Sequence, residues 1–194
     1  IDTTTWDGTS GDAFRSSLGR LRTRTGTVPP AARGVAAALD RLADEMTAAR
    51  ARLTLTSDLA KAVEAADLII EAVPEDPQIK RDLYARLGRL APEGTIFATN
   101  SSTLLPSALA EATGRPARFL ALHFANRIWL HNVAEIMGHP GTDPAVRDEV
   151  TAFARAIGME PIVLEKEQPG YVLNSMLVPF LQSASALWVD GVAQ

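Results

Sequence analysis

The sequence predicts an α/β fold in which helices cover a parallel sheet. Three short apolar runs, at residues 67–73, 95–98 and 119–124, have the length and composition of strands buried on both faces. Segments with helix-start signals lie between these runs, so strands and helices alternate along the chain. Alternation of this kind is typical of sheets whose neighbouring strands run parallel.

The first 33 residues do not fit this pattern. They are rich in Thr, Ser, Gly and Arg, and they show neither a strand-like run nor a sustained helical period. The composition of residues 1–33 therefore predicts an atypical or disordered segment.

The other elements follow from hydrophobic periods and from start and stop signals. Residues 34–53 repeat apolar side chains near a 3.6-residue period, which predicts a helix. Pro77 suits the first turn of a helix that runs to about residue 90. The remaining expected elements are strands at 53–56, 95–100, 132–137 and 160–164, and helices at 57–65, 103–113, 143–157 and 171–189.

Polar side chains gather where the expected strands end. Asn100 and Ser102 follow one apolar run, and His123 and Asn126 close the next. Because ligands of open α/β sheets bind beyond the carboxyl ends of the strands, we expect these four residues on one rim of one sheet. Glu135 interrupts a further apolar run, where an unpaired carboxylate would be costly. We therefore predict that His123 pairs with Glu135, as a general base with its orienting group.

Several motifs in a fixed order resemble one enzyme family. The chain reads N-S-S at residues 100–102 and H-F-A-N at residues 123–126, and Glu135 comes nine residues after that motif. A-D-L-I-I-E-A-V-P-E-D-x-x-x-K lies at residues 66–80, and Q-P-G-Y-V-L-N-S-M-L-V-P-F-L lies at residues 168–181. With these motifs the chain is similar to the L-3-hydroxyacyl-CoA dehydrogenases.

The resemblance covers roughly residues 35–192 and departs from the family pattern at one visible place. The usual form is H-F-F-N-P, whereas this chain has Ala125 and Arg127 at the third and fifth positions. This difference bears on the shape of the substrate pocket and leaves the base in place.

The resemblance implies an incomplete Rossmann-like domain followed by the start of a second domain. Residues 34–167 would form a partial Rossmann-like parallel sheet with flanking helices, which binds NAD. Residues 168–194 would supply the first long helix of an all-helical domain for dimerisation and substrate contacts. Residues 1–33 show neither G-x-G-x-x-G nor the acidic residue that holds the adenine ribose, so an altered remnant of a cofactor half-domain is the alternative there. We therefore expect weak NAD binding by this chain.

The activity that the resemblance implies is NAD-dependent oxidation of (S)-3-hydroxyacyl-CoA to 3-ketoacyl-CoA in fatty acid metabolism. His123 would remove the proton of the 3-hydroxyl group, because imidazole exchanges protons near neutral pH. Glu135 would fix the orientation of the ring. Ser102 and Asn174 would act as catalytic and substrate-binding residues near the reacting oxygen, and Asn126 would support the same substrate contacts.

The resemblance also implies a set of cofactor-binding residues near the nicotinamide half of NAD. Two site residues have simpler explanations, because Glu75 and Ser102 could each cap the helix that follows them. The implied cofactor-binding residues are Ala72, Val73, Glu75, Lys80 and Asn100.

Composition limits the other classes of function. The net charge of −4 does not indicate the positively charged surface that nucleic-acid binding requires. The chain has no cysteine, and its three histidines lack a metal-binding spacing, so no metal site is expected. No apolar run reaches the roughly 18 residues of a membrane helix. No signal peptide is visible, so we expect a cytoplasmic protein that does not bind membranes.

Two other functions remain open. The missing glycine-rich fingerprint favours a non-catalytic binding protein built on a dehydrogenase remnant, and a related dehydrogenase of small hydroxy acids would use the same residues. The partners we expect are an acyl-CoA-type substrate and a second copy of the chain. The helix at residues 171–189 is apolar on more than one side, and a twofold homodimer would bury that surface.

Overall fold

The computed structural model describes residues 30–192, so most of the atypical first segment lies outside the described residues. The chain divides into two compact units, residues 1–55 and 56–194. In the first unit, the described element is helix α2 (Pro30–Ala51), where the hydrophobic period predicted a helix. This helix begins earlier than the sequence indicated.

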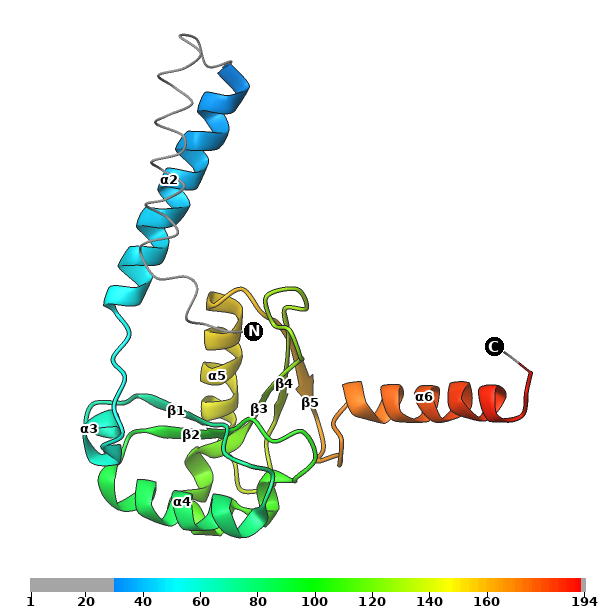
Figure 1. Cartoon of the computed structure of the whole chain (residues 1–194). Helices are drawn as coiled ribbons and strands as arrows, with labels where there is room; N and C mark the ends of the chain where they lie inside the picture. The colour runs from blue at the N-terminus through cyan, green and yellow to red at the C-terminus, as the bar shows by residue number, and fades with distance from the viewer. Residues whose placement is uncertain (1–29, 193–194) are drawn as a thin grey trace. The chain divides into compact units, whose positions relative to one another are not determined.

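Five strands of the described chain form one sheet (Figure 1): β1 (Leu68–Glu71), β2 (Ile96–Thr99), β3 (Phe119–Phe124), β4 (Val133–Met137) and β5 (Glu160–Leu164). Their order in the sheet follows their order in the chain. β1, β2 and β3 run parallel, as the three apolar runs predicted. β4 runs antiparallel to β3, and β5 is parallel to β4. The predicted α/β sheet is therefore confirmed.

Three helices of the second unit begin at aspartate caps. α3 (Leu59–Val63) follows Asp58, α4 (Pro77–Leu90) follows Asp76, and α5 (Pro144–Ala156) follows Asp143. Each aspartate accepts a backbone N–H of the first turn, which lowers the cost of the unpaired donors there. Since Asp76 caps α4, the capping explanation of Glu75 is wrong.

The prediction of a helix at residues 103–113 is also wrong. This stretch contains two short 3-10 helices, Pro106–Ala108 and Ala110–Thr113, neither of which has a side-chain cap. Leu105 is held in an extended conformation, as expected for the residue before a proline, and this interrupts a continuous helix. Ser102 therefore caps no helix.

The strand expected at residues 53–56 is absent. Leu53 is 72% exposed and Leu55 is 95% exposed, and the segment has no regular structure. Strands are stabilised by hydrogen bonds to a neighbouring strand, and the partner of β1 in the described sheet is β2. The local apolar pattern could not form a strand alone.

Alternate residues of β3 face different helices. Leu120 and Leu122 pack with residues of α5, whereas Phe119 packs with residues of α4. Because successive strand residues point to opposite faces, His123 shares the face of Phe119 and Ala121. Figure 1 shows α4 and α5 on either side of the sheet, which is thereby buried on both faces in its centre.

Helix α6 (Leu173–Val189) is the last described helix, at the place where a long helix was expected. It has no buried residue, and the side chains of Met176, Phe180 and Trp188 are each 69% exposed. Across residues 30–192, no helix is both long and apolar enough to span a bilayer.

Candidate active site

His123 and Glu135 face each other across two neighbouring strands. They are paired residues in the antiparallel register of β3 and β4, so their side chains lie on the same face. Nδ1 of His123 lies 2.9 Å from Oε2 of Glu135. His123 is 7% exposed and Glu135 is fully buried. The predicted pair is confirmed as a contact, and the histidine supplies the partner that the buried carboxylate needs.

The second carboxylate oxygen of Glu135 binds the start of α6. Oε1 accepts the backbone N–H groups of Val172 and Leu173, at 2.7 and 2.9 Å. These donors belong to the first turn of the helix, where backbone N–H groups lack helical acceptors and favour negative charge. Glu135 thus links the histidine to the C-terminal helix, a contact that the sequence did not reveal.

Tyr171 completes this cluster, although no role was expected for it from the sequence. Its side chain is fully buried, and its ring centre lies 5.0 Å from that of His123. Burial, together with the nearby carboxylates of Glu75 and Glu135, raises the pKa of the Tyr171 hydroxyl above its ordinary value. The hydroxyl is therefore a neutral donor, and it points to the carbonyl oxygen of Leu104 at 3.4 Å.

Ser102 and Asn174, predicted from the resemblance to share a site, are brought together. Nδ2 of Asn174 donates to the backbone carbonyl of Ser102 at 3.1 Å. This hydrogen bond joins the loop after β2 to the first turn of α6. It uses the main chain of Ser102, whose side chain is exposed, so the hydroxyl role predicted for Ser102 does not depend on this bond.

Asn100 and Asn126 lie at the same rim, but Asn100 is held by a hydrogen bond to a neighbouring strand, whereas Asn126 is exposed. Oδ1 of Asn100 accepts the N–H of Phe124 at 2.9 Å, which ties the end of β2 to the end of β3. Asn126 is exposed in the loop between β3 and β4, next to Arg127, whose φ is 59°. Asn100 therefore shapes the rim, while Asn126 is accessible to a ligand.

Glu75 is held in place by the loop after β2. Its Oε1 accepts the hydroxyl groups of Ser101 and Thr103, at 2.5 and 2.8 Å. Burial alone would raise the pKa of Glu75, but these hydrogen bonds and the charge of Lys80 lower it from 4.5 to about 2. Glu75 is therefore an ionised acceptor near neutral pH, and its side chain remains 40% exposed.

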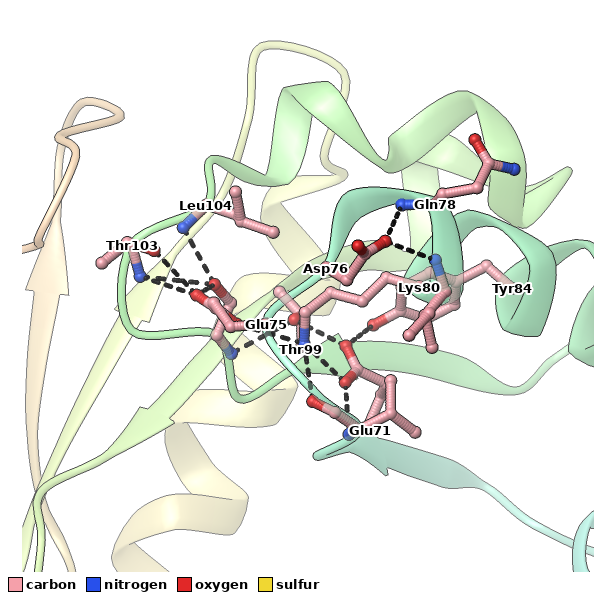
Figure 2. A network of polar contacts seen from close by, with 12 residues as sticks. Glu71, Glu75, Asp76, Gln78, Lys80, Tyr84, Thr99, Thr103 and Leu104 are labelled. Carbon is pink, nitrogen blue, oxygen red and sulfur yellow. Dashed lines mark hydrogen bonds and ion pairs between the residues drawn. The ribbon is translucent and has the colours of Figure 1, made fainter.

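Behind Glu75 lies a buried polar network centred on Glu71 (Figure 2). Oε1 of Glu71 accepts Nζ of Lys80 and the N–H of Val73, both at 2.7 Å. Oε2 accepts the hydroxyl groups of Thr99 and Tyr84, at 2.9 and 3.1 Å. No role was expected for Glu71 from the sequence, although its position in an apolar run is the same signal that pointed to Glu135.

The network corrects the expectation for Lys80. Its side chain is 1% exposed, and Nζ lies 2.7 Å from Glu71 and 3.3 Å from Glu75. Nζ also donates to the carbonyl of Val73 at 3.3 Å. Lys80 therefore holds the 72–75 loop from behind, where a direct contact with a cofactor had been expected. Ala72, Pro74 and Glu75 are the exposed residues of the same loop.

These groups meet at the carboxyl ends of β1, β2 and β3, where open α/β sheets bind ligands. A separate cavity of about 270 Å³ lies beyond the ends of β4 and β5, lined by residues that include His139, Arg147 and Lys166. Because β4 runs antiparallel to β3, that cavity lies at the opposite end of the strands from the carboxyl ends of β1, β2 and β3. The two regions are therefore distinct.

Comparison with known proteins gives the same family as the motifs. The family model described as "3-hydroxyacyl-CoA dehydrogenase, NAD binding domain" matches residues 19–168. The human mitochondrial hydroxyacyl-coenzyme A dehydrogenase is 36% identical over 141 residues, which cover 73% of this chain and 45% of that protein. L-carnitine dehydrogenase of Bacillus cereus is 36% identical over 146 residues, covering 75% of this chain and 45% of the relative.

A solved structure is more similar in sequence. It belongs to a diketoreductase described as acting on dicarbonyl compounds, and it is 62% identical with a TM-score of 0.70, covering 72% of this chain and 49% of the other. The chain spans about half the length of the curated relatives named above. From the motifs, the sheet and the match of residues 19–168 to the family model together, the chain belongs to the 3-hydroxyacyl-CoA dehydrogenase family.

Proposed function

We propose that this chain carries the proton-transfer site of an NAD-dependent oxidoreductase that converts (S)-3-hydroxyacyl-CoA to 3-ketoacyl-CoA in fatty acid metabolism. The observation that carries the proposal is the buried contact between His123 and Glu135. Glu135 also accepts two backbone N–H groups, so it acts as an acceptor towards Nδ1 of His123. Nδ1 then holds the ring proton, and Nε2 is the nitrogen that can take the substrate hydroxyl proton.

The other site residues orient the substrate in this proposal. Ser102 and Asn174 lie together beside the start of α6, where their polar groups can bind the oxygen that loses its proton. Asn126 is exposed in the loop between β3 and β4, and it supports the same substrate. The positive charge that develops on His123 is balanced by Glu135, which faces it at 2.9 Å.

The residues at the rim fit the nicotinamide half of NAD. Glu75 offers an ionised, partly exposed carboxylate, which suits the hydroxyl and amide donors of that group. Ala72, Val73 and Asn100 form the neighbouring edge, and Lys80 keeps Glu75 in position. When bound, NAD supplies the acceptor for the substrate hydride. The sequence of residues 1–33, most of which lie outside the described part, lacks the glycine-rich phosphate-binding fingerprint, and weak NAD binding by this chain stays a prediction.

A second candidate function is reduction of a small dicarbonyl compound. It is favoured by the 62% identity to the diketoreductase, well above the 36% identity to the hydroxyacyl-coenzyme A dehydrogenase. Ala125 and Arg127, which depart from the usual family motif, lie in the loop that follows His123. The same base would serve this reaction, because protonation of a ketone oxygen is the reverse of removing the hydroxyl proton.

Turnover of three substrates distinguishes the two candidates. We expect the protein expressed from its complete gene to oxidise (S)-3-hydroxybutyryl-CoA with a kcat/KM at least about tenfold above that for oxidation of L-carnitine or for reduction of a small dicarbonyl compound, measured through NADH absorbance. A tenfold preference for the dicarbonyl compound would establish the second candidate. Absence of turnover with all three would support the non-catalytic alternative.

We also infer that α6 pairs with a second copy of the chain. Its exposed apolar side chains include Phe180 and Leu181, which are 69% and 50% exposed. Large apolar patches are rarely left in water, and closed twofold pairs are the commonest assembly. We expect sedimentation to show a concentration-dependent dimer that Phe180→Asp/Leu181→Asp abolishes, whereas Gln182→Asp on the same helix leaves it intact. A strictly monomeric wild-type chain at high concentration would contradict this inference.

A further inference from the structure

Tyr171 has a backbone conformation that is unusual for its residue type. Its φ is 56°, in the left-handed region, and Arg127 is the other non-glycine residue of the described chain with a positive φ. Such a conformation is strained in a residue with a bulky side chain, and it persists when the surroundings require it. The neighbouring Gly170 also has a positive φ, of 75°. The chain therefore makes a tight left-handed turn immediately before α6.

The turn places two N–H groups on Glu135. The residues directly after Tyr171, Val172 and Leu173, donate to Oε1 of Glu135 at 2.7 and 2.9 Å. The turn itself is closed by the N–H of Tyr171, which donates to the carbonyl of Gln168 at 2.9 Å. The strained residue is thus the one that aims both donors at the carboxylate paired with His123.

The side chain of Tyr171 acts on the histidine directly. The two rings lie 5.0 Å apart between centroids, with an interplanar angle of 38°, and Tyr171 is fully buried. The hydroxyl group reaches the carbonyl of Leu104, which restricts rotation of the tyrosine ring. Packing of this kind fixes the plane of the imidazole, since a buried ring cannot turn without displacing its neighbour.

We propose that Tyr171 is a positioning residue for the proton-transfer pair, a role that rests on the proposed function of His123. Its backbone turn holds Glu135 through two N–H groups, and its ring holds the plane of the imidazole. Together these contacts keep the proton on Nδ1 of His123 and leave Nε2 as the acceptor. A substitution of Tyr171 removes the contact of its ring with His123. The N–H donors to Glu135 belong to the main chain of Val172 and Leu173 and are still present in the variant.

The tautomer of His123 is the readout that tests this role. In long-range ¹H–¹⁵N spectra of the chain at a pH where His123 is neutral, we expect wild type to show one Nδ1-protonated tautomer with well-separated ring-nitrogen shifts. Tyr171→Phe keeps the ring and is expected to keep this spectrum. Tyr171→Leu keeps an apolar side chain but loses the ring plane, and we expect the two nitrogen shifts to move towards a common average.

A second buried tyrosine provides the matched control. Tyr84 is also fully buried, but its ring packs against Phe97 and Phe119. Phe119 lies at the start of β3, whereas His123 lies near the end of that strand. Tyr84→Leu is expected to leave the His123 spectrum as in wild type, although it removes a comparable ring. Tyr171→Met, with another flexible apolar side chain, replaces the leucine variant if that variant does not fold.

The outcomes separate this proposal from the proposed function. A folded Tyr171→Leu or Tyr171→Met variant with the wild-type tautomer would overturn the positioning role, while the turnover test of His123 would be unaffected. A wild-type spectrum with the proton on Nε2 would instead remove the basis for His123 as the base. Averaged shifts in both the Tyr171→Leu and Tyr84→Leu variants would show a general loss of packing and would also overturn the specific role of Tyr171.

Discussion

Glu135→Gln is expected to reduce kcat about 10⁴-fold, the loss seen when an amide replaces the orienting carboxylate of a serine-protease triad. The glutamine oxygen can still accept the N–H groups of Val172 and Leu173, because both donate to one oxygen of Glu135. The glutamine NH₂ group then faces Nδ1 of His123 as a donor. Nδ1 must accept, so the ring proton moves to Nε2, the nitrogen proposed to take the substrate proton.

Stopped-flow or steady-state NADH formation by the complete protein measures this loss. His123→Ala should reduce kcat at least as much, because it removes the base itself, and the double variant should lose little more than the worse single variant, because the two residues act as a unit. Glu160→Gln, an exposed carboxylate at the start of β5, is the matched control and should retain wild-type turnover. If the kcat of the Glu135→Gln enzyme is within tenfold of the wild-type kcat, the tautomer of His123 does not control the rate.

The sequence was informative where a side chain's environment is set by its own strand. The parallel strands β1 to β3 follow from short apolar runs, since a strand buried on both faces needs apolar residues at successive positions. The contact between His123 and Glu135 was predictable because a carboxylate in such a run requires a partner and the histidine lies in the neighbouring run.

The sequence failed where structure depends on contacts with distant parts of the chain. Residues 53–56 have a strand-like pattern but no neighbouring strand to pair with, and Pro106 divides a stretch that otherwise resembles a helix. The partners of Glu71 come from α4 and β2, so its carboxylate could be recognised as needing a partner while the partners themselves stayed hidden. Tyr171 gave no signal, because the groups that its turn and its ring contact, Glu135 and His123, come from strands β4 and β3, far away in the sequence.

Glu71→Ala is expected to lower the free energy of unfolding of the second unit by about 3–5 kcal/mol, the usual cost of removing one partner of a buried ion pair. Lys80 is 1% exposed, and its nearest carboxylate after the change would be Glu75, at 3.3 Å and with a 40% exposed side chain. The hydroxyl groups of Thr99 and Tyr84 would lose their acceptor as well. Each buried donor left unpaired adds to the cost.

Urea unfolding followed by far-UV circular dichroism measures the change, and hydrogen exchange of the β2 amides assigns it to the second unit. Glu75→Gln is the matched control: it removes a carboxylate from the same lysine but at a partly exposed site, so we expect a loss below about 1 kcal/mol. Glu71→Leu combined with Lys80→Met should recover much of the stability, because removing both charges leaves no unpaired ion in the interior. If Glu71→Ala costs no more than Glu75→Gln, the network does not stabilise the 72–75 loop, and the position of Glu75 must depend on Ser101 and Thr103 alone.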